Sequence, residues 1–290
     1  MKKYIITTES GSDLPQDIIE RYGVHIVPMH VTLGNQTLPD GSFDVQKVFD
    51  FYEETGTLPK TSGSTPHDNT EVFKQVFAKY PDAHIIHIGY SAVTTVSFNA
   101  ANIAAKDFTN IHLVDSKHVS IGLTAVIKAT AQFIEDNPGT SPEEIIDFVK
   151  DIRERTHMVF LPKTLIYLRA GGRVSNLAFY GANLLKINPT IVLSNGYLVS
   201  GKKYRGSFER SLKTMIKDFF RGHEIDPETV LIAGAPSITE HYKKIILDLL
   251  KEKNIKTVKW VKTGAVISSH GGPGAIGISG ISKGLLNPAF

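Results

Sequence analysis

Short apolar runs alternate with segments of helical periodicity over the first half of the chain. Four apolar runs predict buried strands that end in small polar residues: KYIITTES (3–10), VHIVPMHVTLG (24–34), HIIHIGYS (84–91) and IHLVDS (111–116). Helix-like segments separate them: DLPQDIIERYG (13–23), DVQKVFDFYEETG (44–56), NTEVFKQVFAKYP (69–81) and VSFNAANIAAKDF (96–108). This alternation predicts an α/β fold whose sheet is mostly parallel and covered by helices on both faces.

The second half of the chain has a different pattern. Ser141 can cap a helix that ends near residue 155, and we place a domain boundary after that helix. Asn195-Gly196 stands between two β-rich runs and predicts a β-hairpin, with further helices and strands following. We therefore expect two α/β domains, residues 1–156 with a mostly parallel sheet and residues 157–290 with a mixed sheet.

Composition excludes several classes of protein. The chain has 290 residues, 41% of them hydrophobic, and its net charge of +3 is spread along the sequence, which argues against a nucleic-acid-binding surface. The absence of cysteine excludes disulfides and thiolate zinc sites. The apolar start is interrupted at Thr7, too early for a signal peptide, and no apolar run is long enough to span a membrane. We expect a cytoplasmic protein with at most transient membrane contact.

Two motifs resemble a cofactor site and a metal site but do not meet the requirements of either. GPGAIG (272–277) spells G-x-G-x-x-G, but a dinucleotide site needs a preceding strand, a following helix and an acidic residue further on. Only 13 residues follow Gly277, and none is acidic. His84 and His87 are three positions apart in a predicted strand, so their side chains face opposite ways. We expect neither a cofactor nor a metal.

Hydroxyl-rich loops are the main candidates for ligand binding. In TTESGSDLP (7–15), Ser12 or Asp13 either caps the next helix or faces a ligand in the crevice at the strand ends. KTSGSTPHD (60–68) offers hydroxyls that suit an anion without adding charge, and GYSAVTTVSFNAA (89–101) leads into a helix N-terminus. These loops suit an anionic group.

Two arginines and one histidine extend this set of candidates. Arg173 follows two glycines, and Arg205 precedes a predicted helix; each forms either a structural ion pair or a site for an acidic partner. His270 lies within the glycine-rich stretch VISSHGGPGAIGISG (266–280). We expect these glycines to let a loop fold tightly around His270 near the mouth of a ligand site.

Two other interpretations remain open from these residues. Ser91 or Thr94 with His270 and an acid such as Asp115 would form a hydrolase or acyl transferase, although Gly89–Val93 matches G-x-S-x-G only in part. The chain would otherwise bind a different small anion, with side chains filling any cavity.

Six blocks in this order resemble the DegV family over nearly the whole chain: TTESGSDLP, KTSGSTP, VDSKHVSIGL (114–123), YLRAGGRVSN (167–176), GYLVSGKKYRG (196–206) and SSHGGPGAIG (268–277). The resemblance implies two α/β domains with a fatty acid in a tunnel between them. It further implies a non-catalytic carrier, similar to the binding subunit of bacterial fatty acid kinase. Such a carrier presents the carboxylate of a long-chain fatty acid to a separate kinase subunit, which forms an acyl phosphate for phospholipid synthesis.

The resemblance also assigns roles to individual residues. It implies that the fatty-acid carboxylate is bound by Thr61, Ser62, Ser91, Thr94 and His270. It places Arg173 and Arg205 near the head group or on the kinase-docking face.

The loop at 90–96 departs from the family pattern S-S-x-L-S-G-T. Tyr90 stands in place of a serine, Thr94 replaces a serine, and Thr95 replaces the glycine. These changes affect the expected head-group geometry and the wall of the pocket.

Overall fold

The predicted parallel sheet is present in the N-terminal half, and we call it sheet A. In the computed structural model, which describes residues 3–172, 187–255 and 258–283, all neighbouring strands of this sheet run parallel. In spatial order they are β2 (His25–Val27), β1 (Tyr4–Glu9), β6 (His84–Gly89) and β7 (Ile111–Asp115). Side chains alternate between its faces, so that Ile5 packs in one core cluster and Ile6 in another.

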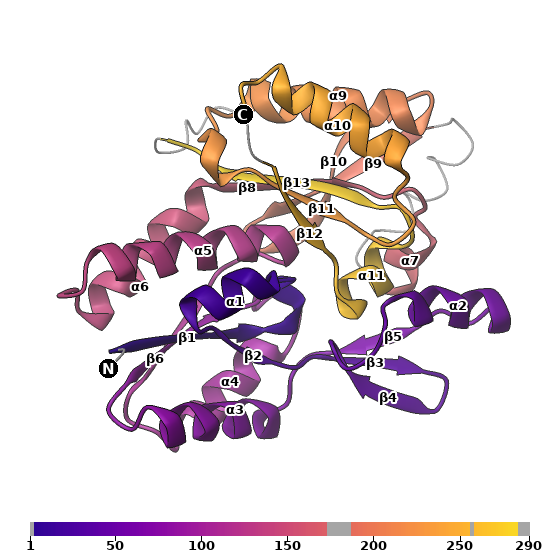
Figure 1. Cartoon of the computed structure of the whole chain (residues 1–290). Helices are drawn as coiled ribbons and strands as arrows, with labels where there is room; N and C mark the ends of the chain where they lie inside the picture. Colours follow the sequence, from indigo (N-terminus) through magenta and orange to yellow (C-terminus); the bar gives the residue numbers. More distant parts are fainter. Residues whose placement is uncertain (1–2, 173–186, 256–257, 284–290) are drawn as a thin grey trace.

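Helices cover both faces of sheet A (Figure 1). Its outer face carries α3 (Pro66–Lys79) and α4 (Ser97–Ala105). The inner face carries α1 (Gln16–Tyr22), α5 (Ser120–Asp136) and α6 (Pro142–Arg155), where Ser141 caps α6 as the sequence predicts.

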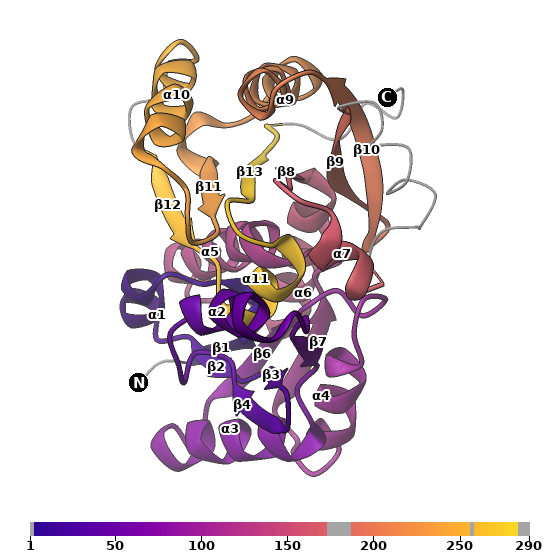
Figure 2. The same cartoon turned by 90° about the vertical axis from the view of Figure 1, so that its right-hand side faces the viewer.

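The C-terminal half contains a mixed six-stranded sheet, which we call sheet C. In spatial order its strands are β10 (Tyr197–Arg205), β9 (Ile187–Ser194), β8 (Thr156–Leu161), β13 (Ile276–Ile281), β11 (Leu231–Gly234) and β12 (Lys259–Lys262). The predicted hairpin is confirmed: β9 and β10 pair antiparallel, with Asn195 and Gly196 both at positive φ in the turn. The helices on its outer face are α9 (Phe208–Gly222) and α10 (Glu240–Lys251), as Figure 2 shows.

Helix α5 lies between the two sheets and was not predicted. Every residue from Ser120 to Ile127 is buried, so the segment lacks the amphipathic periodicity of a surface helix. It packs against strands of both sheets, and one core cluster joins Ile6 and Ile86 of sheet A to Leu231 of sheet C. The predicted boundary at 156/157 falls between α6 and β8; the division into two domains stays a prediction, because this core is shared.

The apolar run at 24–34 forms two strands in different sheets, not the single strand predicted. β2 ends at Val27, just before Pro28, and the chain then enters β3 (His30–Leu33). A proline cannot donate a hydrogen bond to a strand ladder, which explains the break. β3 pairs antiparallel with β4 (Gln36–Pro39) and β5 (Lys60–Ser62); we call this small sheet, which is packed against α2 (Gln46–Thr55), sheet B.

The glycine-rich stretch is also organised differently from the expected loop. Residues 265–271 form a helix, α11 (Ala265–Gly271), and His270 lies in its last turn. Gly272 and Gly274 then adopt positive φ in the turn that leads into β13. A helix therefore precedes the G-x-G-x-x-G letters, and β13 begins within their last two residues, the reverse of the order in a dinucleotide-binding turn.

The remaining elements are short. They are η1 (Ser10–Ser12), η2 (Pro227–Thr229) and α7 (Ile166–Ala170). Within the described ranges, no helix has both the length and the apolar character needed to cross a membrane.

Candidate functional site

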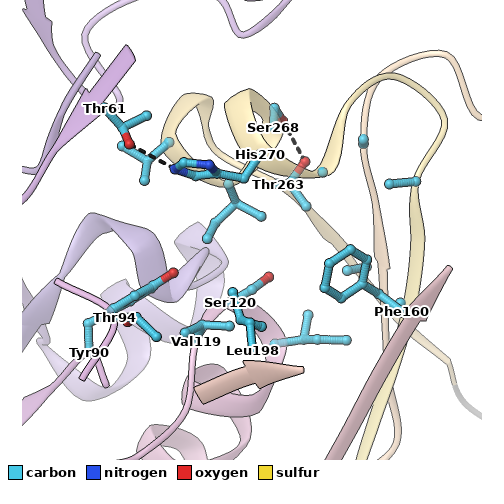
Figure 3. A pocket seen from close by; sticks show the side chains of 18 of the residues that line it. Thr61, Tyr90, Thr94, Val119, Ser120, Phe160, Leu198, Thr263, Ser268 and His270 are labelled. Atoms are coloured by element: carbon cyan, nitrogen blue, oxygen red, sulfur yellow. Dashed lines mark hydrogen bonds between the residues drawn. The ribbon is translucent and has the colours of Figure 1, made fainter. Parts of the chain in front are cut away.

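A cavity lies where sheet B, the loop after β6, α5, α11 and sheet C meet. Both halves of the chain line it. Its apolar walls include Val119, Met158, Phe160 and Leu198, several of which Figure 3 shows. Its polar lining side chains are Thr61, Ser62, Thr94, Thr95, Ser120, Thr263, Ser268 and His270. No Asp, Glu, Lys or Arg is among the residues that line it, so the cavity suits a mainly apolar molecule with one polar group.

Thr61 and His270 come together at one polar end of the cavity. The hydroxyl Oγ1 of Thr61 lies 2.8 Å from Nε2 of His270, in a hydrogen bond that joins sheet B to α11 (Figure 3). Both side chains are partly buried and both line the cavity. The bond links two predicted carboxylate-binding residues that are 209 positions apart in the sequence.

Glycines allow close approach of the backbone to this histidine. A Cβ atom on Gly171 would lie 2.1 Å from Nδ1 of His270, and one on Gly272 would lie 2.8 Å from the ring of Tyr167. A substituted residue at either position would displace its neighbour. The glycines therefore bring α7 and the end of α11 into close contact around His270, within a helix rather than a loop.

The loop that follows β6 is tied to its surroundings by hydroxyl groups. The Ser91 hydroxyl is fully buried and donates to the carbonyl of Gly196 in the hairpin turn, at 2.8 Å; Ser91 is not in the cavity lining. The Thr94 hydroxyl lines the cavity and donates to the Ser91 carbonyl at 2.8 Å. Ser91 thus attaches the loop to sheet C, while Thr94 presents its side chain to the cavity.

A second contact joins this loop to the hydroxyl loop at residues 60–68. The Ser97 hydroxyl accepts a hydrogen bond from the backbone N–H of Ser64 at 3.0 Å and lies 3.2 Å from Thr95 Oγ1. A Cβ on Gly63 would lie 2.4 Å from Ser97 Oγ. The two loops predicted to bind the head group are therefore packed directly on each other.

Asp13 connects the first loop to α11 and does not cap α1. One carboxylate oxygen accepts from the backbone N–H of Gly264 at 2.7 Å, and the other accepts from the hydroxyl of Ser120 at 2.5 Å. Asp40 accepts in the same way from the backbone N–H of Ala265, at 2.8 Å. Burial raises the pKa of Asp13 to about 8 and also raises that of Asp40. Two buried carboxyl groups thus fix the start of the helix that carries His270.

A buried polar network supports the cavity wall from the side of sheet A. Oε2 of Glu9 accepts from the backbone N–H of Tyr90 at 2.8 Å, and Oε1 of Glu9 lies 3.5 Å from Nε2 of His87. Thr7 Oγ1 lies 2.9 Å from the other ring nitrogen of His87. His84, by contrast, pairs with His112 near the surface, so His84 and His87 do face opposite ways. Within the described segments, no group of three His, Asp or Glu side chains is placed to hold a metal ion.

In the hydrolase interpretation, Ser91 or Thr94 would act with His270 and Asp115, and the structure gives Ser91 and Asp115 other partners. The Ser91 hydroxyl donates to a carbonyl group, and His270 bonds to Thr61. Asp115 accepts from the backbone N–H groups of Ala92 and Lys117. Among the described residues, neither Ser91 nor Asp115 is hydrogen-bonded to His270, so the triad lacks its acid and, in the Ser91 form, also its nucleophile.

The other residues predicted for the site differ in their position relative to the cavity. Ser62 lies beside Thr61 at the end of β5 and lines the cavity. Arg205 ends β10 as an exposed side chain and is not a lining residue. Arg173 lies outside the described residues.

Sequence reasoning did not identify three polar residues that line the cavity, namely Ser120, Thr263 and Ser268. Ser120 and Ser268 lie within two of the blocks that resemble the family, VDSKHVSIGL and SSHGGPGAIG, so a signal for them was present. Thr263 lies in none of the six blocks.

Comparison with known proteins identifies relatives over nearly the full length. The family described as "Uncharacterised protein, DegV family" matches residues 3–283. A DegV domain-containing protein of Clostridium perfringens is 30% identical over 284 residues, which cover 96% of this chain and 98% of the relative.

Solved structures give the same result for the fold. A fatty-acid-binding DegV family protein from Thermus thermophilus aligns with a TM-score of 0.84 and 25% identity, over 97% of this chain and 99% of that one. A stearic acid-binding protein from Eubacterium ventriosum aligns with a TM-score of 0.80 and 22% identity, over 98% and 99% of the two chains.

Proposed function

The chain belongs to the DegV family, and we propose that it binds one long-chain fatty acid in the cavity between its two halves. The acyl chain lies along the apolar walls, and the carboxylate lies at the end formed by Thr61 and His270. The observation that carries this proposal is the Thr61–His270 hydrogen bond at one end of an apolar cavity that lacks formally charged lining residues. The fatty acids bound by the structural relatives support it.

The energetics favour a carrier that is held by the tail of its ligand. Each buried methylene contributes roughly 0.8 kcal/mol, so ~14 methylenes contribute on the order of 10 kcal/mol before the cost of ordering the chain. Each hydrogen bond to a carboxylate contributes only about 1.5–3 kcal/mol. The tail therefore dominates affinity, while Thr61, Ser62, Thr94 and His270 set the orientation of the carboxylate. Ser91 acts by positioning the 91–94 loop through its bond to Gly196.

We further propose that the bound carboxylate is presented to a separate kinase subunit, which converts it to an acyl phosphate for phospholipid synthesis. Uncharged donors suit this role, because charge-assisted hydrogen bonds from Arg or Lys are roughly twice as strong as neutral ones and would hold the carboxylate more tightly. Arg205, exposed at the end of β10, is a candidate for contact with the kinase. No step of this proposal requires chemistry by the carrier itself.

Mass spectrometry of the purified protein tests the binding proposal. The protein should carry one fatty acid under native conditions, and solvent extraction should release it. Loss of the hydroxyl in Thr61→Val should weaken fatty-acid binding by about tenfold or more. Thr37→Val is the matched control, because Thr37 bonds to Thr32 at 2.9 Å on the same sheet B but does not line the cavity. A protein that is empty and takes up no added fatty acid would overturn the proposal.

The kinase step needs a separate assay. His270→Ala should raise the Kd for fatty acid by roughly 10- to 150-fold, the loss of one hydrogen bond to the carboxylate, while the tail still supplies most of the affinity. It should reduce acyl phosphate formation by a fatty acid kinase subunit much more strongly at saturating fatty acid. Equal phosphorylation of the wild-type and His270→Ala carriers would exclude a role for His270 in presentation.

A further inference from the structure

We propose that Thr263 and Ser268 form a second polar subsite in the cavity, which binds a hydroxyl group on the chain of the fatty acid. This inference rests on the proposed fatty-acid binding and narrows its ligand class to acyl chains that carry an oxygen substituent. The subsite is distinct from the Thr61–His270 pair, and the resemblance to the family assigns no role to either of its residues.

The two hydroxyls are buried, and both belong to residues that line the cavity. Thr263 is 7% exposed and Ser268 is 1% exposed, and both belong to the cavity lining. Their oxygens are 2.7 Å apart, in a hydrogen bond in which either atom can be the donor. Within the part of the chain that is described, this is the only hydrogen bond that either hydroxyl makes.

Hydrogen-bond capacity remains after the two hydroxyls bind each other. A hydroxyl has one O–H donor and two acceptor lone pairs. In a mutual bond one O–H is used, so the pair keeps one O–H and several lone pairs beside an otherwise apolar wall. A ligand hydroxyl at this position can accept from the remaining O–H and donate to one of the two oxygens.

The subsite is placed to act on the same ligand as the head-group end. Ser268 and His270 both lie on α11, and Figure 3 shows the Thr263–Ser268 bond apart from the Thr61–His270 bond around one shared space. Phe160 lies on the side of Thr263 and provides apolar wall there. A chain whose carboxylate is at Thr61 and His270 can therefore pass Thr263 and Ser268 within the cavity.

An unsubstituted saturated acyl chain cannot use the hydrogen-bond capacity that remains on Thr263 and Ser268. It places methylenes against a buried O–H that has lost its water, whereas a hydroxylated chain supplies the missing partner. Sites with buried polar groups discriminate in this way against analogues that lack the matching group. The wall should thus favour one position of the hydroxyl on the chain, fixed by its distance from the carboxylate.

The test compares stearic acid with a series of hydroxystearic acids that carry the hydroxyl at successive carbons. For the wild-type protein, at least one isomer should bind about tenfold more tightly than stearic acid, which corresponds to about 1.4 kcal/mol. In the double variant Thr263→Val/Ser268→Ala, which removes both hydroxyls, the ratio of the Kd for stearic acid to the Kd for the preferred isomer should fall toward one.

Ser269→Ala provides the matched control. Ser269 is a buried neighbour on α11, but its hydroxyl donates to the Ala265 carbonyl at 2.7 Å and it does not line the cavity. It should keep the wild-type preference. The subsite would be overturned if the protein binds stearic acid but prefers no hydroxylated isomer, or if the preference is unchanged in the double variant Thr263→Val/Ser268→Ala. Failure to bind either class of acid would instead contradict the proposed function.

Discussion

Replacement of Asp13 by asparagine should remove a large pH dependence from the stability of this protein. Asp13 is buried between the first loop and α11, where it accepts hydrogen bonds from Ser120 and Gly264. Burial raises its pKa to about 8, from an ordinary value near 4. Asparagine keeps an oxygen that accepts from Gly264, and its amide can donate to the Ser120 hydroxyl, but it does not ionise.

The sign of this dependence follows from the direction of the pKa shift. A carboxyl group with a higher pKa in the folded state binds its proton more tightly there, so protonation stabilises the fold. This contribution is fully present below about pH 4 and is lost as the pH rises toward 8. Over that window the free energy of unfolding falls by about 1.4 kcal/mol per pH unit, or roughly 4 kcal/mol between pH 4 and pH 7. Asp13→Asn lacks this loss.

Urea unfolding of the wild type and Asp13→Asn at several pH values measures the effect. The stability of the variant relative to the wild type should rise by about 3 kcal/mol between about pH 5 and pH 7. Taking this difference cancels the titration of groups common to both proteins. The free energy of unfolding of Asp13→Ala, relative to the wild type, should have the same pH slope but be lower by a constant amount at every pH. The loss arises because the donors of Ser120 and Gly264 are left buried without their acceptor.

The expected slope requires that burial raises the pKa of Asp13 more than its two hydrogen bonds lower it. If the difference between wild type and Asp13→Asn stays constant with pH, Asp13 is ionised throughout this range, and the donors from Ser120 and Gly264 dominate its environment. That result would refute the conclusion that a protonated Asp13 carboxyl holds the start of α11.

Three further substitutions test separate parts of the structure. Burial lowers the pKa of His118 to about 4, so stability should be lost by about 1.4 kcal/mol per unit as the pH falls from about 6.5 to 4; His118→Gln should flatten that limb in urea titrations. Gly171→Ala should displace the ring of His270 and weaken fatty-acid binding several-fold, measured by calorimetry, while the fold is retained; unchanged binding would refute the role of that ring. Gly196→Val should lower the free energy of unfolding by about 1–3 kcal/mol, because φ is +85° and a Cβ would lie 2.6 Å from Ser91 Oγ; a neutral result in thermal unfolding would contradict this.

The periodicity of the sequence determined most of the secondary structure. Apolar runs that end in small polar residues predicted the strands of sheet A, and Asn195-Gly196 predicted the hairpin of sheet C. These patterns are local, because a strand or helix facing a core needs apolar residues at its own period, and a tight turn needs positive φ at particular positions. The hydroxyl-rich loops could also be recognised from local sequence alone. Thr61, Ser62 and Thr94 of these loops line the cavity.

Other features depended on which layers pack together. Helix α5 lies between two sheets, and every residue from Ser120 to Ile127 is buried, so this half of the helix carries no amphipathic signal. Pro28 marked a break in the run at 24–34, but only the pairing of β3 with β4 and β5 decided that sheet B forms there. A local pattern indicates that a segment is buried, but it does not indicate which other elements the segment packs against.

The site itself was decided almost entirely by tertiary structure. Thr61 and His270 are 209 residues apart and bond only because sheet B packs against α11. Asp13 looks like a helix cap in the sequence, yet its partners are Ser120 and Gly264, which tertiary packing brings from distant segments. The sequence determines which side chains can donate or accept hydrogen bonds, whereas burial and the approach of other layers decide which of them meet.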